Sequence, residues 1–114
     1  MGLSIPETLI TNDADKAAEF CEKCGGTVAL KTFGGNNLKG GDGKGLVIYT
    51  RGITKRELLE HSDSMKYVPV MLENYVPKSI ELRVTVVGDS VFACGIHSQD
   101  SPRTKDDWRH YDLG

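Results

Sequence analysis

The residue best suited to binding an anion is Lys31, which lies in an apolar segment just before a glycine-rich one. A lysine in a half-buried strand is costly unless an anion meets its ammonium group. Six glycines fall between Gly34 and Gly45, together with Lys39 and Lys44. Glycines let the backbone approach phosphate oxygens, and successive N–H groups form an anion-binding nest. The pattern indicates a phosphate-binding loop, with an exposed hairpin loop and a snorkelling lysine as the structural alternative.

The glycine-rich segment matches neither common nucleotide motif. A Walker A loop would have glycine where Leu38 stands and serine or threonine where Gly45 stands. A dinucleotide-binding fingerprint is excluded because no G-x-G-x-x-G opens a helix. The chemistry of this loop therefore rests on its glycines and lysines alone.

Two further polar segments could bind a nucleotide. Glu73 to Val76 ends an expected strand, where a carboxylate and free backbone groups could bind an adenine edge, although a solvated strand end is the simpler interpretation. Glu81 and Arg83 share one face of a strongly alternating strand. They could bind ribose hydroxyls and an anion respectively, or they could simply face water.

The cysteines have zinc-like spacing in Cys21-x-x-Cys24 and Cys94-x-x-His97. The first pair lies on the apolar face of a helix near its C-terminal end, where the helix dipole does not activate a thiol. The second pair differs by an odd number within a strand, so its members point to opposite faces. We expect buried reduced thiols and no metal ligands in this chain, with a small zinc protein as an alternative.

The expected elements alternate between strands and helices over the first 76 residues. A helical face is formed by Ala17, Phe20, Cys21 and Cys24. We expect a strand at Ile5–Thr11 at a sheet edge, and then a helix that ends at Gly25 and Gly26. Strands at Thr27–Phe33 and Gly45–Thr50 would flank the loop Gly34–Lys44. A second helix would begin at the capping box Thr54–Glu57, and a strand at Tyr67–Val76 would follow it.

The remaining residues predict a β-hairpin and a tail. Ser79–Val87 alternates strictly, Gly88-Asp89 forms a two-residue turn, and Val91–Ser98 returns. Gln99–Gly114 has no clear period and is expected to be disordered or ordered by a partner. Because two strands form only a marginal sheet, the hairpin must dock on the first part, dimerise or belong to a longer protein.

Composition excludes several classes of protein. The 14 basic and 16 acidic residues give a net charge of −2, which argues against a mainly electrostatic nucleic-acid binder. No apolar run approaches the ~20 residues of a membrane span, and the N-terminus lacks the features of a signal peptide. The chain is therefore expected to be soluble and cytoplasmic.

The order of these motifs resembles the ATP-grasp superfamily. The segments IELRVTVVGDSVFACGIHSQ and DDWRHYD resemble the RimK-type and microviridin-type (graspetide) peptide ligases, and GLSIPETLITND resembles the start of their ATP-grasp region. The resemblance implies an α+β fold. Residues 1–76 would form the small ATP-grasp subdomain, an antiparallel four-stranded sheet with two helices, and residues 77–114 the first β-hairpin of the larger subdomain.

The resemblance also implies roles in binding ATP. Lys31 would contact adenine N7 and the α-phosphate, and Glu73 would accept a hydrogen bond from the adenine amino group. A shift of one position, to Asn74, stays open because the family often has an apolar residue, Gln and Glu at Leu72-Glu73-Asn74. The other implied contacts are the backbone of Tyr75 and Val76 to the adenine ring, Glu81 to the ribose, Arg83 to the phosphates or an acyl phosphate, and Gly40, Gly41, Gly43 and Lys44 in a mobile loop over the β- and γ-phosphates.

The implied activity is the ATP-dependent ligation of a carboxylate to an amine or hydroxyl through an acyl phosphate, on a peptide or amino acid. The cofactors would be ATP and Mg²⁺, whose ligands in the family, an Asp and then Glu-x-Asn, are expected outside this chain. The chain would then be a central fragment that does not turn over alone. The alternative is a non-catalytic nucleotide- or peptide-binding module derived from the same fold. No nucleic acid or membrane is expected as a partner, and self-association stays open.

Overall fold

The computed structural model describes residues 2–33, 37–39, 45–47 and 49–110. Contacts divide the chain into two compact units, Met1–Val76 and Pro77–Gly114, and each is described by itself. In the described part of the chain, no helix is long and apolar enough to cross a membrane.

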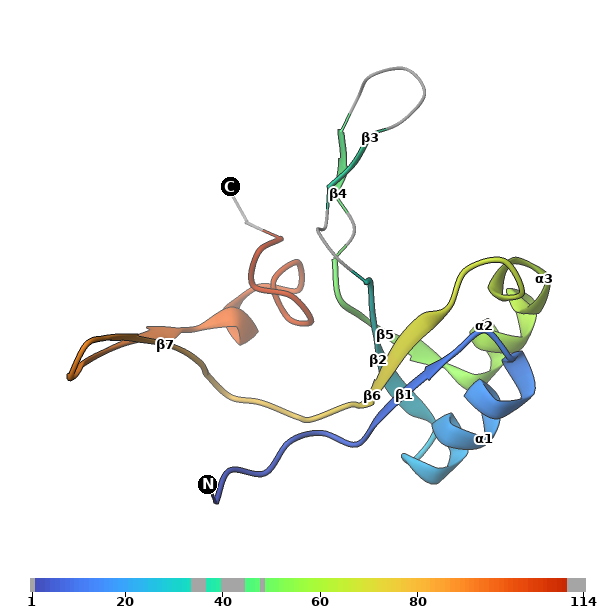
Figure 1. The fold of residues 1–114 in the computed structure, drawn as a ribbon, viewed down its shortest axis with the longest axis horizontal. Helices are drawn as coiled ribbons and strands as arrows, with labels where there is room; N and C mark the ends of the chain where they lie inside the picture. Colours follow the sequence, from blue (N-terminus) through green and yellow to red (C-terminus); the bar gives the residue numbers. More distant parts are fainter. Residues whose placement is uncertain (1, 34–36, 40–44, 48, 111–114) are drawn as a thin grey trace. The chain divides into compact units, whose positions relative to one another are not determined.

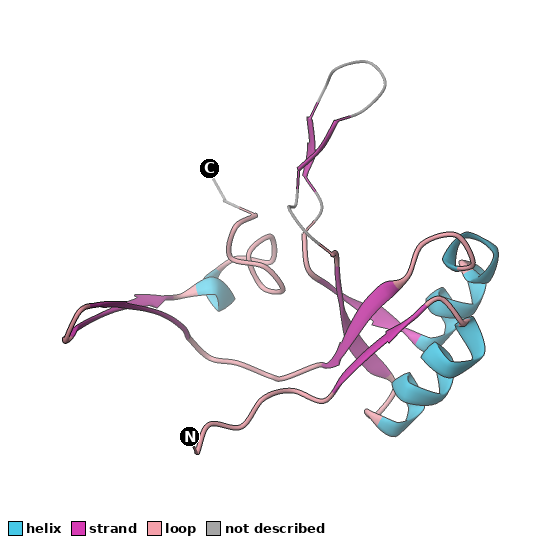
Figure 2. Cartoon of the chain, in the orientation of Figure 1, coloured by secondary structure: helices cyan, strands magenta, loops and turns pink. Residues whose placement is uncertain are grey.

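A four-stranded antiparallel sheet forms the centre of the first unit (Figures 1 and 2). Its spatial order is β1-β6-β2-β5, with β1 at an edge as the sequence predicts. The strands are β1 (Thr8–Thr11), β2 (Thr27–Lys31), β5 (Arg51–Thr54) and β6 (Val70–Asn74). The predicted α+β class and four-stranded sheet are therefore confirmed.

In the described part of the first unit, three helices accompany this sheet, and the first two begin at the predicted signals. They are α1 (Ala14–Lys23), α2 (Lys55–Glu60) and the single turn α3 (Ser62–Met65), which the sequence analysis missed. Asp13 caps α1 by accepting from two backbone N–H groups, and Thr54 and Glu57 form the predicted capping box of α2. Gly25, with φ of 89°, takes the left-handed conformation that follows α1.

The helices cover one face of the sheet, and the core lies between the two layers (Figure 1). Val28 and Leu72 are fully buried on neighbouring strands, and they face Cys21 of α1 and Leu58 of α2 within one cluster. Because side chains alternate along a strand, the residues between these apolar positions point to the opposite face. Within the described residues of the first unit, the second face of the sheet carries no helix (Figure 2).

The predicted strand Gly45–Thr50 is wrong as a member of this sheet. Its place beside β2 is taken by β5, in which Ile53 pairs with Val28 and is buried in the core. Instead, β4 (Gly45–Val47) pairs with β3 (Asn37–Lys39) in a separate two-stranded sheet, so the predicted loop Gly34–Lys44 contains a strand. An apolar run identifies a strand but not its partner, and here the partner is local.

The second unit contains the predicted hairpin. β7 (Glu81–Val87) pairs with β8 (Ser90–Ile96) around Gly88, whose φ is 59°. The alternation is as predicted, since Leu82, Val84 and Val86 share one face and remain more than half exposed.

Residues 97–110, which follow the hairpin, form a hydrogen-bonded loop, in contrast to the expected disordered or partner-ordered tail. A 3₁₀ turn, η1, spans Ser98–Asp100. Thr104 donates to the carbonyl oxygen of Ser98 at 2.7 Å, and the buried carboxylate of Asp107 accepts from Arg109. Hydrogen bonds from side chains, rather than an apolar period, hold this loop, so the sequence pattern gave no sign of it.

We predict that Leu72→Ala lowers the free energy of unfolding by about 2–5 kcal/mol, because it opens a cavity in the centre of the core. Chemical denaturation measures the change. Leu3→Ala is the matched control, since Leu3 is 83% exposed. Equal effects of the two substitutions would contradict this assignment of the core.

We predict that the cap of α2 makes the stability of the chain depend on pH. Hydrogen bonds from the backbone and side chain of Thr54, and then from Arg51, lower the pKa of Glu57 from 4.5 to about 2. A lowered folded-state pKa contributes stability above the unfolded pKa and loses it as the pH falls through the folded one. The stability difference between the wild type and Glu57→Gln should therefore be constant above about pH 5 and shrink between pH 4.5 and 2.

Denaturation at several pH values measures this difference. Glu60→Gln removes a charge from the same helix without touching the capping box and serves as the control. The same profile in both variants would attribute the effect to net charge and not to the cap.

Candidate functional site

Lys31 and Glu73 lie together on the face of the sheet that the helices leave open. In the β2–β6 register Ala29 pairs with Glu73 and Lys31 with Met71, so these side chains share the face opposite Val28 and Leu72. Lys31 Nζ is 2.5 Å from Glu73 Oε2. The Glu73 side chain is 15% exposed and that of Lys31 is 39% exposed. The pair therefore forms a half-sheltered charged site on two central strands.

This contact explains how a lysine is accommodated near the end of β2. The anion that meets its ammonium in this structure is the carboxylate of Glu73, 42 residues away in the sequence. An ionised carboxylate only accepts hydrogen bonds, whereas the ammonium donates three. Side by side, the two groups offer complementary contacts to a ligand that carries both an amino group and an anion.

Asn74 lies on the other face of the sheet. It pairs with Val28 and shares the orientation of Leu72 toward the helices. Its Oδ1 atom is buried and accepts no hydrogen bond within the described part of the chain. Of the two residues that the sequence left open for the adenine edge, only Glu73 is beside Lys31.

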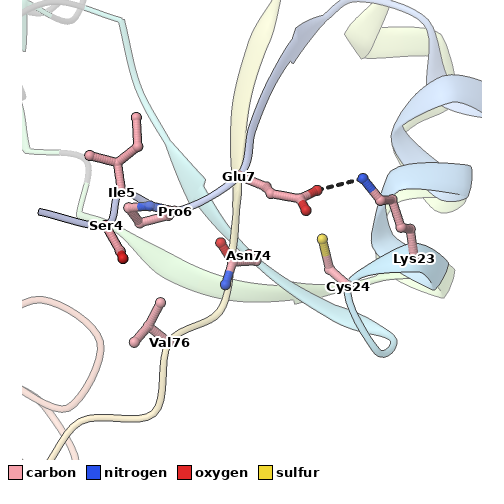
Figure 3. A pocket seen from close by; sticks show the side chains of 8 residues that line it. All are labelled: Ser4, Ile5, Pro6, Glu7, Lys23, Cys24, Asn74 and Val76. Carbon is pink, nitrogen blue, oxygen red and sulfur yellow. Dashed lines mark hydrogen bonds and ion pairs between the residues drawn. The ribbon is translucent and has the colours of Figure 1, made fainter. Parts of the chain in front are cut away.

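A pocket of about 710 Å³ lies on the Asn74 side of the first unit (Figure 3). Its lining comes from the N-terminal segment, the end of α1 and the end of β6. These residues are Ser4, Ile5, Pro6, Glu7, Lys23, Cys24, Asn74 and Val76. Glu7 and Lys23 form an ion pair of 2.6 Å at its edge (Figure 3). The pocket includes Val76 but neither Lys31 nor Glu73, so it is separate from the charged pair.

The thiols of Cys21, in α1, and of Cys24, which follows this helix, are poor nucleophiles. Burial, and then the neighbouring Cys24, raise the pKa of Cys21, while partial burial and the Glu7 carboxylate raise that of Cys24. Both groups are therefore protonated near neutral pH. Cys21 is buried, but Cys24 is only partly buried and Cys94 is exposed, which corrects the expectation that all three thiols are buried. Within residues 2–33, 37–39, 45–47 and 49–110, no three His, Cys, Asp or Glu side chains are grouped to hold a metal ion.

The remaining expected residues of the first unit fall into two groups. Tyr75 and Val76 follow the end of β6, outside the strand. Gly40, Gly41, Gly43 and Lys44 lie outside the described residues. Their implied contacts to nucleotide stay predictions.

In the second unit, Glu81 and Arg83 lie on one face of β7, as their spacing predicts. Arg83 is exposed, but Glu81 is 24% exposed and its Oε1 atom is 2.8 Å from Lys78 Nζ. The sequence analysis did not single out Lys78. Its position three residues before Glu81, with opposite charge, was the one available signal.

Comparisons with solved structures identify similar proteins. One is a RiPP-associated ATP-grasp ligase from Chryseobacterium gregarium, solved with ADP and a leader and core peptide. Its sequence is 37% identical to this chain, and the TM-score is 0.83. The match covers 96% of this chain and 32% of that one. The macrocyclase MdnC from Microcystis aeruginosa, bound with the precursor peptide MdnA, is 30% identical with a TM-score of 0.73, over 90% of this chain and 35% of MdnC.

The ATP-grasp ligase PsnB, at 23% identity and a TM-score of 0.63, shares the fold. No protein-family model and no curated protein matches the sequence. The chain spans about a third of the length of the solved structures it matches. The resemblance to graspetide-type ATP-grasp ligases is therefore confirmed.

We predict that Lys31 and Glu73 are energetically coupled. The test is a double-mutant cycle of Lys31→Met and Glu73→Gln, measured as free energies of unfolding. The coupling should be about 0.5–2 kcal/mol, because each substitution leaves the charge of the other residue half-buried and unpaired. The exposed pair Arg56 and Glu60 provides a control cycle with a smaller coupling. Additive effects of Lys31→Met and Glu73→Gln would contradict the contact.

Proposed function

We propose that this chain, which has the fold of graspetide-type ATP-grasp ligases, is the ATP-binding part of an enzyme that joins a carboxylate to an amine or hydroxyl on a peptide. The observation that carries the proposal is the Lys31–Glu73 pair on the open face of the sheet, in a chain 37% identical to a ligase solved with ADP. The proposal commits to ATP because this pair combines an acceptor for an amino group with a cation for a phosphate.

In the first unit, Glu73 would accept a hydrogen bond from the exocyclic amine of adenine. Guanine has a carbonyl oxygen at the corresponding position, which a carboxylate repels, so this contact favours ATP over GTP. The ammonium group of Lys31 would then leave its ion pair with Glu73 and bind the α-phosphate instead. The backbone of Tyr75 and Val76 would contact the adenine ring, and Gly40, Gly41, Gly43 and Lys44 would close over the β- and γ-phosphates.

In the second unit, Glu81 would accept hydrogen bonds from the ribose hydroxyls, and Arg83 would neutralise the phosphates or the acyl phosphate. Both lie on β7, and a strand holds side chains in defined directions. We assign the two units, 1–76 and 77–114, to the small subdomain and to the beginning of the large one.

The proposed reaction has two steps. The carboxylate oxygen attacks the γ-phosphorus of ATP, and ADP leaves as an acyl phosphate forms. The amine or hydroxyl then attacks the acyl carbon, and inorganic phosphate leaves as the amide or ester forms. The residues of this chain would contribute positioning and charge neutralisation, which dominate catalysis of phosphoryl transfer.

The Mg²⁺ of the proposed reaction would be held by residues outside this chain, as the resemblance to ATP-grasp ligases implies. PsnB has been solved with Mg and ADP.

The test is a titration of the chain with ATP and GTP, followed by amide NMR shifts and by the dissociation constants. We expect shifts at Lys31 and at residues 73–76, and a preference for ATP. Lys31→Met should weaken ATP binding about tenfold through the loss of a charge-assisted contact. Glu73→Gln should reduce the ratio of ATP to GTP affinity, since an amide can also donate to a carbonyl.

Lys16→Met and Glu19→Gln, both exposed on α1, are the matched controls and should bind ATP like the wild type. The proposal fails if the folded chain binds no ATP. Shifts confined to other residues would overturn the assigned site, and an unchanged ATP to GTP ratio in Glu73→Gln would overturn the role of that carboxylate. ATP binding by a longer chain that forms no product would favour the non-catalytic module.

A further inference from the structure

Lys78 joins two parts of the second unit. Its Nζ atom lies 2.8 Å from Glu81 Oε1 at the start of β7, and it donates a hydrogen bond of 3.2 Å to the backbone carbonyl of Asp106. The Lys78 side chain is 25% exposed. Lysine on a solvated surface is usually far more exposed, so this ammonium is held in place by its two acceptors.

The contact determines which part of Glu81 a ligand can reach. Glu81 Oε1 is buried and accepts no well-directed hydrogen bond from the residues that the structure describes, so its ion pair with Lys78 compensates its charge. Because Oε1 is held against Lys78, a ligand that binds Glu81 would have to contact it through the other oxygen, Oε2. Without Lys78 the charge on the buried Oε1 atom would have no compensating cation. The Glu81 carboxylate would then rotate toward water.

The second acceptor ties the loop after β8 to the same lysine. Asp106 precedes Asp107, whose carboxylate is 4% exposed and accepts hydrogen bonds from Arg109 Nε at 2.8 Å and Nη2 at 2.5 Å. The position of Lys78 is therefore fixed by an ordered loop and not by Glu81 alone.

We propose that Lys78 is a positioning residue that presents one oxygen of Glu81 to the ribose hydroxyls of the nucleotide. The inference rests on the proposed role of Glu81 in ATP binding. Lys78 itself touches no part of the ligand and acts through the orientation of Glu81.

The readout is the preference for ATP over 2′,3′-dideoxy-ATP, which lacks both ribose hydroxyls. A lysine that only attracts phosphate would strengthen the binding of both nucleotides equally. A lysine that positions Glu81 strengthens the binding of ATP alone. The ratio of the two dissociation constants, measured on the full chain, separates these roles.

We expect Lys78→Met to reduce this ratio about five- to tenfold, toward that of Glu81→Gln, since one charge-assisted contact to the ribose is lost. The double variant should show no further loss, because both substitutions remove the same contact. Lys78→Arg, which keeps the charge, should retain most of the preference. Lys105→Met, at an exposed lysine of the same unit, is the control and should behave like the wild type.

Amide NMR shifts of the Lys78→Met variant show whether the unit stays folded, and changes centred on residues 104–110 are expected from the lost contact to Asp106. Lys78→Met that keeps the full preference for ATP overturns the inference. So does an equal loss of affinity for both nucleotides. If the wild-type chain binds ATP with no preference over the dideoxy nucleotide, the role of Glu81 fails and that of Lys78 with it. If the wild-type chain binds neither nucleotide, the proposed function fails as well.

Discussion

The register of β6 is the constraint on which the rest of the first unit depends. Leu72 is fully buried against the helices, so its neighbour Glu73 must face the opposite side. A slip of one residue would place Glu73 in the apolar core and Leu72 in water. Burial of Leu72 therefore fixes the side of the sheet on which Glu73 meets Lys31. The helices and the charged pair occupy separate faces for this single reason, and the stability of the core positions the site.

Local signals in the sequence were sufficient for the caps, the turn and the alternation of β7. Thr54 and Glu57 accept hydrogen bonds from each other's backbone N–H groups within one helical turn, and Gly88 permits a positive φ. The cap and the turn can therefore be predicted without knowledge of distant residues. The four-stranded sheet was harder. Its strand β5 is only four residues long and shares Thr54 with the cap of α2, whereas the apolar run at Gly45–Val47 pairs with a local strand. Periodicity identifies strands, but pairing decides which sheet they join.

The candidate site was predictable residue by residue but not as a set of contacts. Lys31 was notable because a charge in an apolar strand needs an explanation, and Glu73 because it ends a strand. Their ion pair spans 42 residues of sequence and depends on the β2–β6 register, which no local pattern reveals. Lys78 was missed for the same reason: its second acceptor is the backbone of a loop without any period. Resemblance to a family supplied roles for single residues, while the structure supplied their neighbours.

The position of β6 also has a consequence for how the chain folds. This strand is the last of the sheet to be synthesised, yet it lies between β1 and β2. When synthesis has reached only residue 60, β1 has no strand to pair with in this sheet, because its neighbour β6 (Val70–Asn74) has not yet been made. The sheet closes by insertion, and its contacts between distant residues make that step slow relative to helix formation. Until then, the apolar side chains of α1 and β2 lack their final cover, which is the state in which nascent chains are most open to chaperones and to aggregation.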